Sequence, residues 1–399
     1  MPIKPEIADF EAEMRAWRRD LHTHPELGFE EERTSAFVAR QLRAFGLDEV
    51  VERIGGTGVV GVLHGRGGAG DNSGPRIGLR ADMDALPIEE ENEFSYRSQV
   101  PGKMHACGHD GHTTMLLGAA KYLASHRNFR GTVHFIFQPA EEGLGGAQRM
   151  LDDGLFERFP CDGVYGLHNW PQLPAGTFAV RAGPAMAAAD RFDVTVTGRG
   201  AHGAMPHLSI DPLLAAVDMV SALQSVVSRN VDPLDSAVVS ITQIHSGTTH
   251  NIIPAEARFG GTARSFRPET RDFLERRIRE IVTGIAEAHG TTATVSFIRQ
   301  MSATINSPQQ TEWARAVAAD LVGGEAVRTD IPPSMGAEDF GEMLLQVPGN
   351  YIWLGQGKGP GTPMLHTSKY DFNDEVLTLG ASYWAALVET LAPLRLTPG

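Results

Sequence analysis

The chain has 399 residues, a length that suggests more than one core, and its net charge is −14. Its residues are 42% apolar and 21% charged, which is the composition of a globular protein. No apolar run approaches the roughly 18 residues that cross a membrane, and no basic cluster suggests nucleic acid as a partner. The N-terminus lacks the apolar stretch of a signal peptide, and Cys107 and Cys161 alone form no disulfide framework, so we expect a cytoplasmic protein.

The first part of the chain predicts strands that alternate with helices, a rhythm that is typical of an α/β sheet. Polar residues repeatedly follow the predicted strands, and such sheets place their functional sites at the carboxyl ends of strands. The expected elements are helices over 7–21 and 31–45, a β-hairpin around 56–63, strands over 76–79, 132–137 and 163–167, and a helix of about 16 residues after Met104–His112.

From about residue 185 the predicted elements change to a β-α-β-β-α-β order, that of a ferredoxin-like α+β unit. Its strands are expected over 191–197, 237–244, 257–266 and 292–298, and its helices over 211–230 and 268–289. The α/β pattern then resumes with helices from Thr311 and Ala337, a strand over 351–354 and a closing helix over 374–391. We therefore predict one domain formed by 1–184 and 300–399, and a second domain inserted into it at 185–299.

The segment Met104–His112 holds three histidines, Cys107 and an aspartate within nine residues. A cysteine and a histidine two positions apart can face one metal ion, and such ligands suit zinc and its neighbours. A single cysteine–histidine motif of this kind is more often a buried cysteine beside histidines that cap a helix. The rest of the chain favours the metal, because further candidate ligands follow other predicted strands. The candidate ligands are Cys107, His109, Glu142, His168 and His366.

Five such side chains are about as many as two metal ions need when a water bridges them. Mixed sulfur, nitrogen and oxygen ligands fit Zn²⁺, with Mn²⁺, Co²⁺ and Ni²⁺ as alternatives. Glu141, next to Glu142, is then a spare carboxylate that can take a proton from a metal-activated water, which describes hydrolysis. A different hypothesis makes Cys107 a nucleophile activated by His109 or His112, but it leaves the two glutamates and the other histidines unexplained.

Four motifs resemble the M20 metallopeptidase family, and in particular its amidohydrolase branch of hippurate hydrolases, N-acyl-amino-acid amidohydrolases and plant auxin-conjugate hydrolases. They are RADMDALP at 80–87, HACGHDGH at 105–112, QPAEEG at 138–143 and GLHN at 166–169. The resemblance runs from Arg18 to His366, nearly the whole chain. It implies a mixed-sheet α/β catalytic domain of the di-metal aminopeptidase type, with the ferredoxin-like domain inserted for dimerisation.

The resemblance also implies roles for single residues around the metals. Cys107 would bridge two divalent ions, which the other four candidate ligands would complete. Glu141 would be the general base. Asp84 would support the metal site without binding the ions itself. Asp82 stands where more distant relatives have a histidine ligand, and we expect it to be structural because His109 supplies that imidazole.

Three residues of the predicted insertion match family positions that contact the substrate. His202 matches a histidine that reaches across a dimer to the developing oxyanion in the partner's site. Asn251 and Arg264 match positions that bind the free carboxylate of the substrate, a task that suits the two-pronged guanidinium of arginine. From the residues alone, His202 is a loop histidine and Arg264 a solvated cation on a strand.

The expected function is therefore that of a homodimeric, two-metal amidohydrolase, with further pairing of dimers left open. It would cleave the amide bond of small N-acyl-amino acids and release a carboxylic acid and a free amino acid. Two alternatives remain: a dipeptidase or carboxypeptidase of the same family, and a non-catalytic metal-binding homologue. The sequence leaves the preferred acyl group, the amino acid and the metal open.

Overall fold

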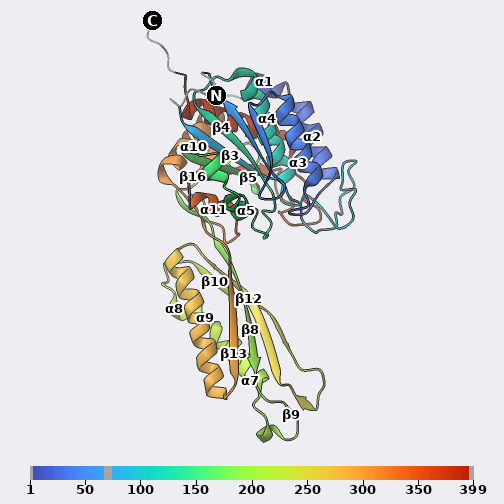
Figure 1. Cartoon of the computed structure of the whole chain (residues 1–399), viewed down its shortest axis with the longest axis vertical. Coiled ribbons are helices and arrows are strands. Elements are labelled where there is room, and N and C mark those ends of the chain that lie inside the picture. Colours follow the sequence, from blue (N-terminus) through green and yellow to red (C-terminus); the bar gives the residue numbers. More distant parts are fainter. Residues whose placement is uncertain (1–2, 67–73, 395–399) are drawn as a thin grey trace. The chain divides into compact units, whose positions relative to one another are not determined.

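A computed structural model describes residues 3–66 and 74–394 of the chain (Figure 1). The described chain forms two compact units. Unit 1 holds the residues up to Ala185, Ile305–Pro332 and the residues from Asp339 on, and unit 2 holds Met186–Thr304 and Pro333–Glu338. Within the described ranges, no helix has the length and apolar character that a membrane span requires.

Unit 1 is built on an eight-stranded sheet with the strand order β1-β2-β4-β3-β5-β16-β6-β15. The middle strands β4, β3, β5 and β16 run parallel to one another, whereas β1, β2 and β6 contribute antiparallel pairs. The predicted mixed α/β sheet is thus confirmed. The strands are β1 (Glu49–Ile54), β2 (Gly58–His64), β3 (Arg76–Asp82), β4 (Thr132–Gln138), β5 (Gly163–Pro174), β6 (Phe178–Ala179), β15 (Val327–Arg328) and β16 (Gly349–Gly357).

Helices cover this sheet, and α4 (His109–His126) and α12 (Leu377–Leu391) are its most deeply buried ones. Both helices are buried on nearly every side, as expected for helices enclosed by others. A Cβ on Gly380 of α12 would come within 2.0 Å of Met115 Sδ in α4, so glycine permits this close approach. The other helices are α1 (Pro5–Ala8), α2 (Glu11–Thr23), α3 (Glu32–Ala44), α5 (Gly146–Asp152), α6 (Leu155–Arg158), α10 (Pro308–Val322) and α11 (Phe340–Leu344).

Unit 2 is a four-stranded antiparallel sheet in the order β10-β12-β8-β13, with α7 and α9 packed on one face. Alternate side chains of β8, namely Phe192, Val194 and Val196, meet Met219 of α7 and Ile278 of α9 in its core. The elements are β8 (Ala188–Thr197), α7 (Pro212–Leu223), α8 (Ser225–Asn230), β10 (Ala237–Ser246), β12 (Glu256–Ser265), α9 (Pro268–His289) and β13 (Thr292–Met301).

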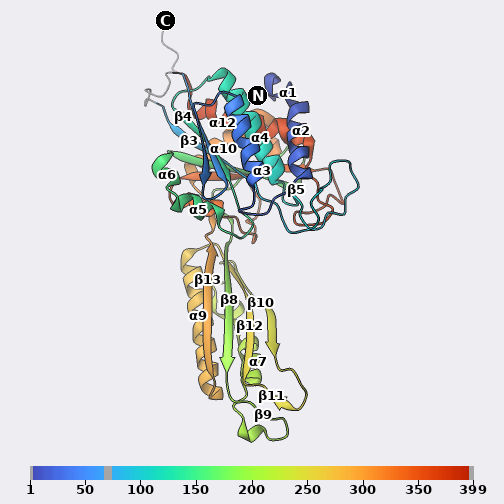
Figure 2. The same ribbon diagram turned by 45° about the vertical axis from the view of Figure 1, so that its right-hand side comes forward.

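Two short sheets complete the chain. One is a ribbon of β9 (Ala201–His202) with β11 (Ile252–Ile253). It lies at one end of unit 2, where Figure 2 labels both strands. The other pairs β7 (Gly183–Met186) with β14 (Thr304–Asn306).

Three predicted helices differ most from the observed ones. The helix expected over 211–230 is interrupted at Gln224, where the Ser225 hydroxyl donates to the Ala222 carbonyl and competes with the helical bonds. The helix expected over 7–21 is split into α1 and α2, because the Phe10 N–H turns back to the Ile7 carbonyl. The helix expected from Ala337 begins only at Phe340, since Asp339 directs its carboxylate to buried partners in unit 1.

Candidate metal centre

The candidate ligands of unit 1 gather at the edge of the sheet where parallel strands end. Glu141 and Glu142 follow β4, Asp82 ends β3, and His366 lies beyond β16. The loop with Cys107 leads directly into α4. Because neighbouring parallel strands end at the same edge, residues far apart in the sequence meet there. His168 was expected just after a strand, but it lies within β5, whose pairing with β16 continues to Pro174.

Two groups of potential ligand atoms within this cluster share Cys107. The first contains Cys107, His109 and His168, and the second contains Cys107, Glu142 and His366. In each group the potential ligand atoms all lie within 4.8 Å of one another. The structure therefore brings together all five side chains singled out from the sequence, and Cys107 belongs to both groups.

The hydrogen bonds of two histidines direct their Nε2 atoms into the cluster. His168 donates from Nδ1 to the Asn169 carbonyl at 2.7 Å, and its Nε2 lies 3.4 Å from Cys107 Sγ. His109 Nδ1 lies 2.9 Å from the carbonyl and 3.1 Å from the carboxylate of Asp84. Its Nε2 is buried and makes no hydrogen bond with any described residue. An outer partner on Nδ1 that leaves Nε2 available is the usual arrangement of a metal-binding histidine.

Glu142 and His366 complete the cluster on its open side. Glu142 Oε1 is buried without a hydrogen bond among the described residues, and it lies 3.2 Å from Nε2 of the half-exposed His366. The His366 backbone has a positive φ of 61°, and its N–H donates to the Ala106 carbonyl at 2.8 Å, beside Cys107. Buried polar atoms without partners are costly, so these orphan atoms and their donor types fit bound cations.

The charge around the cluster also favours a cation. Burial and the nearby Glu142 carboxylate raise the pKa of the Cys107 thiol well above its usual range. Burial opposes the protonation of His109, yet the Asp82 and Asp84 carboxylates raise its pKa to about 10. Carboxylates thus outnumber the cations here, which stabilises neither a free thiolate nor a cysteine nucleophile. Divalent ions would offset this charge and hold the thiolate.

A buried arginine anchors the strands that carry these acids. Arg80 is 1% exposed, and its guanidinium lies 2.7 Å from Asp82 and 3.1 Å from Asp339. Asp82 is also 2.6 Å from Nδ1 of His112. These contacts fit the structural role expected for Asp82. Neither Arg80 nor Asp339 was predicted as a site residue, although an arginine within a buried strand is itself a signal, because such a charge needs a partner.

Asp84 joins two parts of the cluster. Besides its contacts with His109, its Oδ2 accepts a hydrogen bond from the Glu142 backbone N–H at 2.9 Å. One buried carboxylate therefore orients a histidine and fixes the loop after β4, which agrees with the supporting role expected for it.

The three candidate residues of unit 2 do not lie together. His202 and Asn251 are exposed on the β9–β11 ribbon, where the Gly203 N–H donates to the Asn251 carbonyl at 2.7 Å. Arg264 lies toward the other end of β12, opposite Ala189 of β8. Glu256 begins β12 three residues after the ribbon strand β11. Arg264 is eight residues farther along β12, which corresponds to roughly 26 Å at about 3.3 Å per residue. Within unit 2, Asn251 and Arg264 therefore cannot bind the same carboxylate.

Arg264 has the surroundings of an anion-binding residue. Its side chain is about half-buried, and burial lowers the pKa of the guanidinium. Asp190 lies near enough to favour the charge of Arg264, but among the described residues Arg264 makes no hydrogen bond or ion pair. A partly desolvated arginine without a partner is suited to bind a carboxylate.

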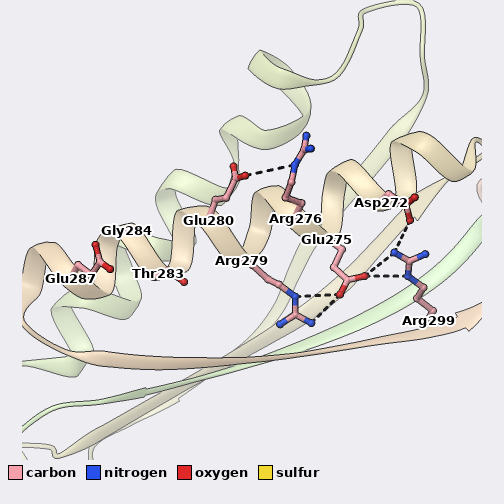
Figure 3. A pocket seen from close by; sticks show the side chains of 9 residues that line it. All are labelled: Asp272, Glu275, Arg276, Arg279, Glu280, Thr283, Gly284, Glu287 and Arg299. Carbon is pink, nitrogen blue, oxygen red and sulfur yellow. Dashed lines mark hydrogen bonds and ion pairs between the residues drawn. The ribbon is translucent and has the colours of Figure 1, made fainter.

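A hollow on unit 2 differs in character from the cluster of candidate ligands. A groove of about 650 Å³ runs along α9 beside Arg299 of β13 (Figure 3). Arg279 is paired with Glu275 at 2.9 Å, and Arg299 lies 2.7 Å from Asp272. Three of the four acids that line the groove, Asp272, Glu275 and Glu280, are paired with its three arginines. Because surface pairs of this kind are solvated, they give the groove no feature of a catalytic site.

Comparison with known proteins identifies the family. The family model described as "Peptidase family M20/M25/M40" matches residues 78–390. The hippurate hydrolase of Campylobacter jejuni subsp. jejuni is 45% identical over 387 residues, with 97% of this chain and 98% of that protein covered. Thermostable carboxypeptidase 1 of Saccharolobus solfataricus is 39% identical over 393 residues, with 96% and 97% covered.

A solved structure agrees with these relatives over the whole fold. It is that of the Bacillus subtilis YXEP protein, described as a dinuclear metal binding peptidase from the M20 family. Its TM-score is 0.82 at 36% identity, with 96% of this chain and 99% of that chain covered. Both the sequence match and the structural match extend across the candidate metal centre. The chain belongs to the M20/M25/M40 peptidase family.

Proposed function

We propose that the protein is a dinuclear metal-dependent amidohydrolase that cleaves N-acyl-amino acids into a carboxylic acid and a free amino acid. The observation that carries this proposal is the cluster of five ligand side chains that overlap at Cys107, with Glu141 beside it. The similarity to a hippurate hydrolase, which extends over nearly the full length of both chains, supports this substrate class.

In this proposal Cys107, His109, Glu142, His168 and His366 hold two divalent ions, most simply Zn²⁺, with Mn²⁺, Co²⁺ or Ni²⁺ as alternatives. When bound, the ions acidify a water and polarise the acyl carbonyl. Glu141, 6% exposed and beside these ligands, takes the proton of the attacking water and delivers it to the leaving amine nitrogen. A cytoplasmic location is part of this proposal, and the two free cysteines agree with it.

The substrate class is tested with a panel that separates the related chemistries. We expect release of amino acid from N-benzoylglycine or from N-acetyl-amino acids to exceed release from unmodified dipeptides. The similarity to a thermostable carboxypeptidase makes peptidase activity the second candidate. Faster hydrolysis of dipeptides than of every N-acyl-amino acid would replace the first assignment with the second.

We further propose that the protein is a homodimer formed through unit 2. Helix α7 exposes Leu213, Leu214 and Val217 on one side, and β10 is an edge strand that exposes Ile244. Edge strands and contiguous apolar surface are commonly covered by a partner. In such a dimer, His202 and Asn251 of one protomer would contact the substrate of the other protomer, and Arg264 of that other protomer would bind the same carboxylate. This arrangement accounts for the separation of Asn251 from Arg264.

Mixed dimers test whether His202 acts across the dimer. We expect His202→Ala and Glu141→Gln each to be nearly inactive alone, and their mixture to regain about a quarter of the wild-type activity after subunit exchange. The reason is that half of the dimers are mixed, and each mixed dimer has one complete site of two. If His202 acts within its own chain, every site carries a defect and the mixture stays as inactive as its components.

A further inference from the structure

Glu31 is a fully buried carboxylate whose contacts lead to the metal centre. It occupies the N-cap position of α3, yet its side chain makes no hydrogen bond to that helix. Instead, Oε1 accepts from the Ala140 backbone N–H at 2.8 Å, and Oε2 accepts from the Thr57 hydroxyl at 2.5 Å. A buried acid that does not cap its own helix and binds the residue before Glu141 calls for a different role.

The loop that Glu31 contacts has a backbone conformation that needs support. Ala140 has a φ of 52°, in the left-handed region that a residue with a Cβ seldom adopts. Its carbonyl accepts from the Gly146 N–H at 3.0 Å, so both backbone groups of Ala140 are bonded. A Cβ on Gly28 would lie 2.9 Å from the Ala140 Cβ, so the segment before α3 packs directly on this loop. Such a conformation persists only where its surroundings hold it.

Two buried carboxylates therefore bracket Glu141. Glu31 binds the N–H of the residue before it, and Asp84 binds the N–H of the residue after it, Glu142. If a substitution removed the Glu31 carboxylate, the Ala140 N–H would be buried without an acceptor. Rotation of that peptide unit would relieve this loss and would turn Glu141 and Glu142 away from the cluster.

We propose that Glu31 is a positioning residue, which holds Ala140 in its left-handed conformation and thereby directs Glu141 and Glu142 into the metal centre. The proposal rests on the function proposed above for these two glutamates. Outer hydrogen-bond partners of this kind commonly change metal affinity or activity by about 10–100-fold when removed. Glu31 acts through the loop and touches neither metal nor substrate.

The test compares Glu31→Ala and Glu31→Gln with Glu26→Ala. The amide oxygen of glutamine can still accept from Ala140, and its NH₂ can donate to Thr57. Burial raises the pKa of Glu31 to about 7, so the neutral amide is a small electrostatic change near neutral pH. Glu26 is the matched control, because its carboxylate binds the Arg33 and Thr34 N–H groups at the start of α3 and not the loop.

Metal-free protein is titrated with Co²⁺ to obtain affinities, and kcat and KM are measured at saturating metal. For Glu31→Ala we expect Co²⁺ affinity and kcat each to fall about tenfold or more with KM within about twofold, and Glu31→Gln to restore both. Glu26→Ala should lower thermal stability only. Equal behaviour of Glu31→Ala and Glu26→Ala, or no recovery in Glu31→Gln, would overturn the proposal.

A milder variant keeps the test decisive if Glu31→Ala does not fold. Thr57→Val removes the hydroxyl that aligns Glu31, and it should lower Co²⁺ affinity about threefold. Unchanged affinity in Thr57→Val would then reject the role of Glu31. The Co²⁺ titration needs no substrate, so it decides on Glu31 even if the wild-type protein hydrolyses none of the amides tested.

Discussion

Glu141→Gln should lower kcat by about 10²–10⁴-fold while both metal ions stay bound, which is the usual loss when a general base is removed. The amide is nearly isosteric with the carboxylate, but it cannot take a proton from water. Because Glu141 is 6% exposed and lies within the cluster, bulk solvent cannot readily replace it. The measurement is kcat on the best N-acyl-amino acid, together with the metal content of the same sample.

Its neighbour provides the control. Glu142→Gln should lower metal affinity first, since Glu142 Oε1 is an orphan atom that faces His366. Substitution of Glu141 would thus lower kcat, whereas substitution of the adjacent Glu142 would lower metal affinity. A Glu141→Gln enzyme with both ions and a kcat within tenfold of the wild type would remove Glu141 from the mechanism.

Arg80→Met should lower the free energy of unfolding of unit 1 by about 3–5 kcal/mol, because it leaves the buried Asp82 and Asp339 carboxylates without their cation. Methionine keeps most of the side-chain volume, so the loss reports charge more than packing. The free energy is measured by urea denaturation followed by tryptophan fluorescence.

Arg76→Met is the matched control on the same strand. Arg76 pairs with Asp162 at the surface, where both side chains are nearly half exposed, so its loss should cost at most about 1 kcal/mol. Similar destabilisation by the two variants would contradict the anchoring role of Arg80.

Local pattern was sufficient to predict many elements of this fold. The helix over 268–289 was predicted with both of its bounds, because Pro268 sets its first turn and Gly290, with a φ of 67°, ends it. The strands β3 and β4 begin where their apolar runs begin. The predicted start of α4 was late, because His109 and Asp110 are polar residues that turn inward to buried partners.

The metal centre could be predicted because its residues are rare types at recognisable spacings. The residues that support it could not be predicted in this way. Glu31 resembles the other acids of its charged segment in sequence, and only the tertiary fold buries it against Ala140. The separation of Asn251 from Arg264, by contrast, follows from the strand predicted over 257–266, because Asn251 precedes this strand and Arg264 lies near its far end.

Metal titration of the wild-type protein distinguishes a dinuclear metal centre from a cysteine nucleophile. Chelated protein should be inactive, bind two divalent ions per chain, and regain hydrolysis of N-acyl-amino acids as the ions bind. Measured beside it, Cys107→Ala should bind the ions more weakly. Full activity after complete removal of metal, with loss of activity only in Cys107→Ala, would contradict this account and identify Cys107 as a nucleophile.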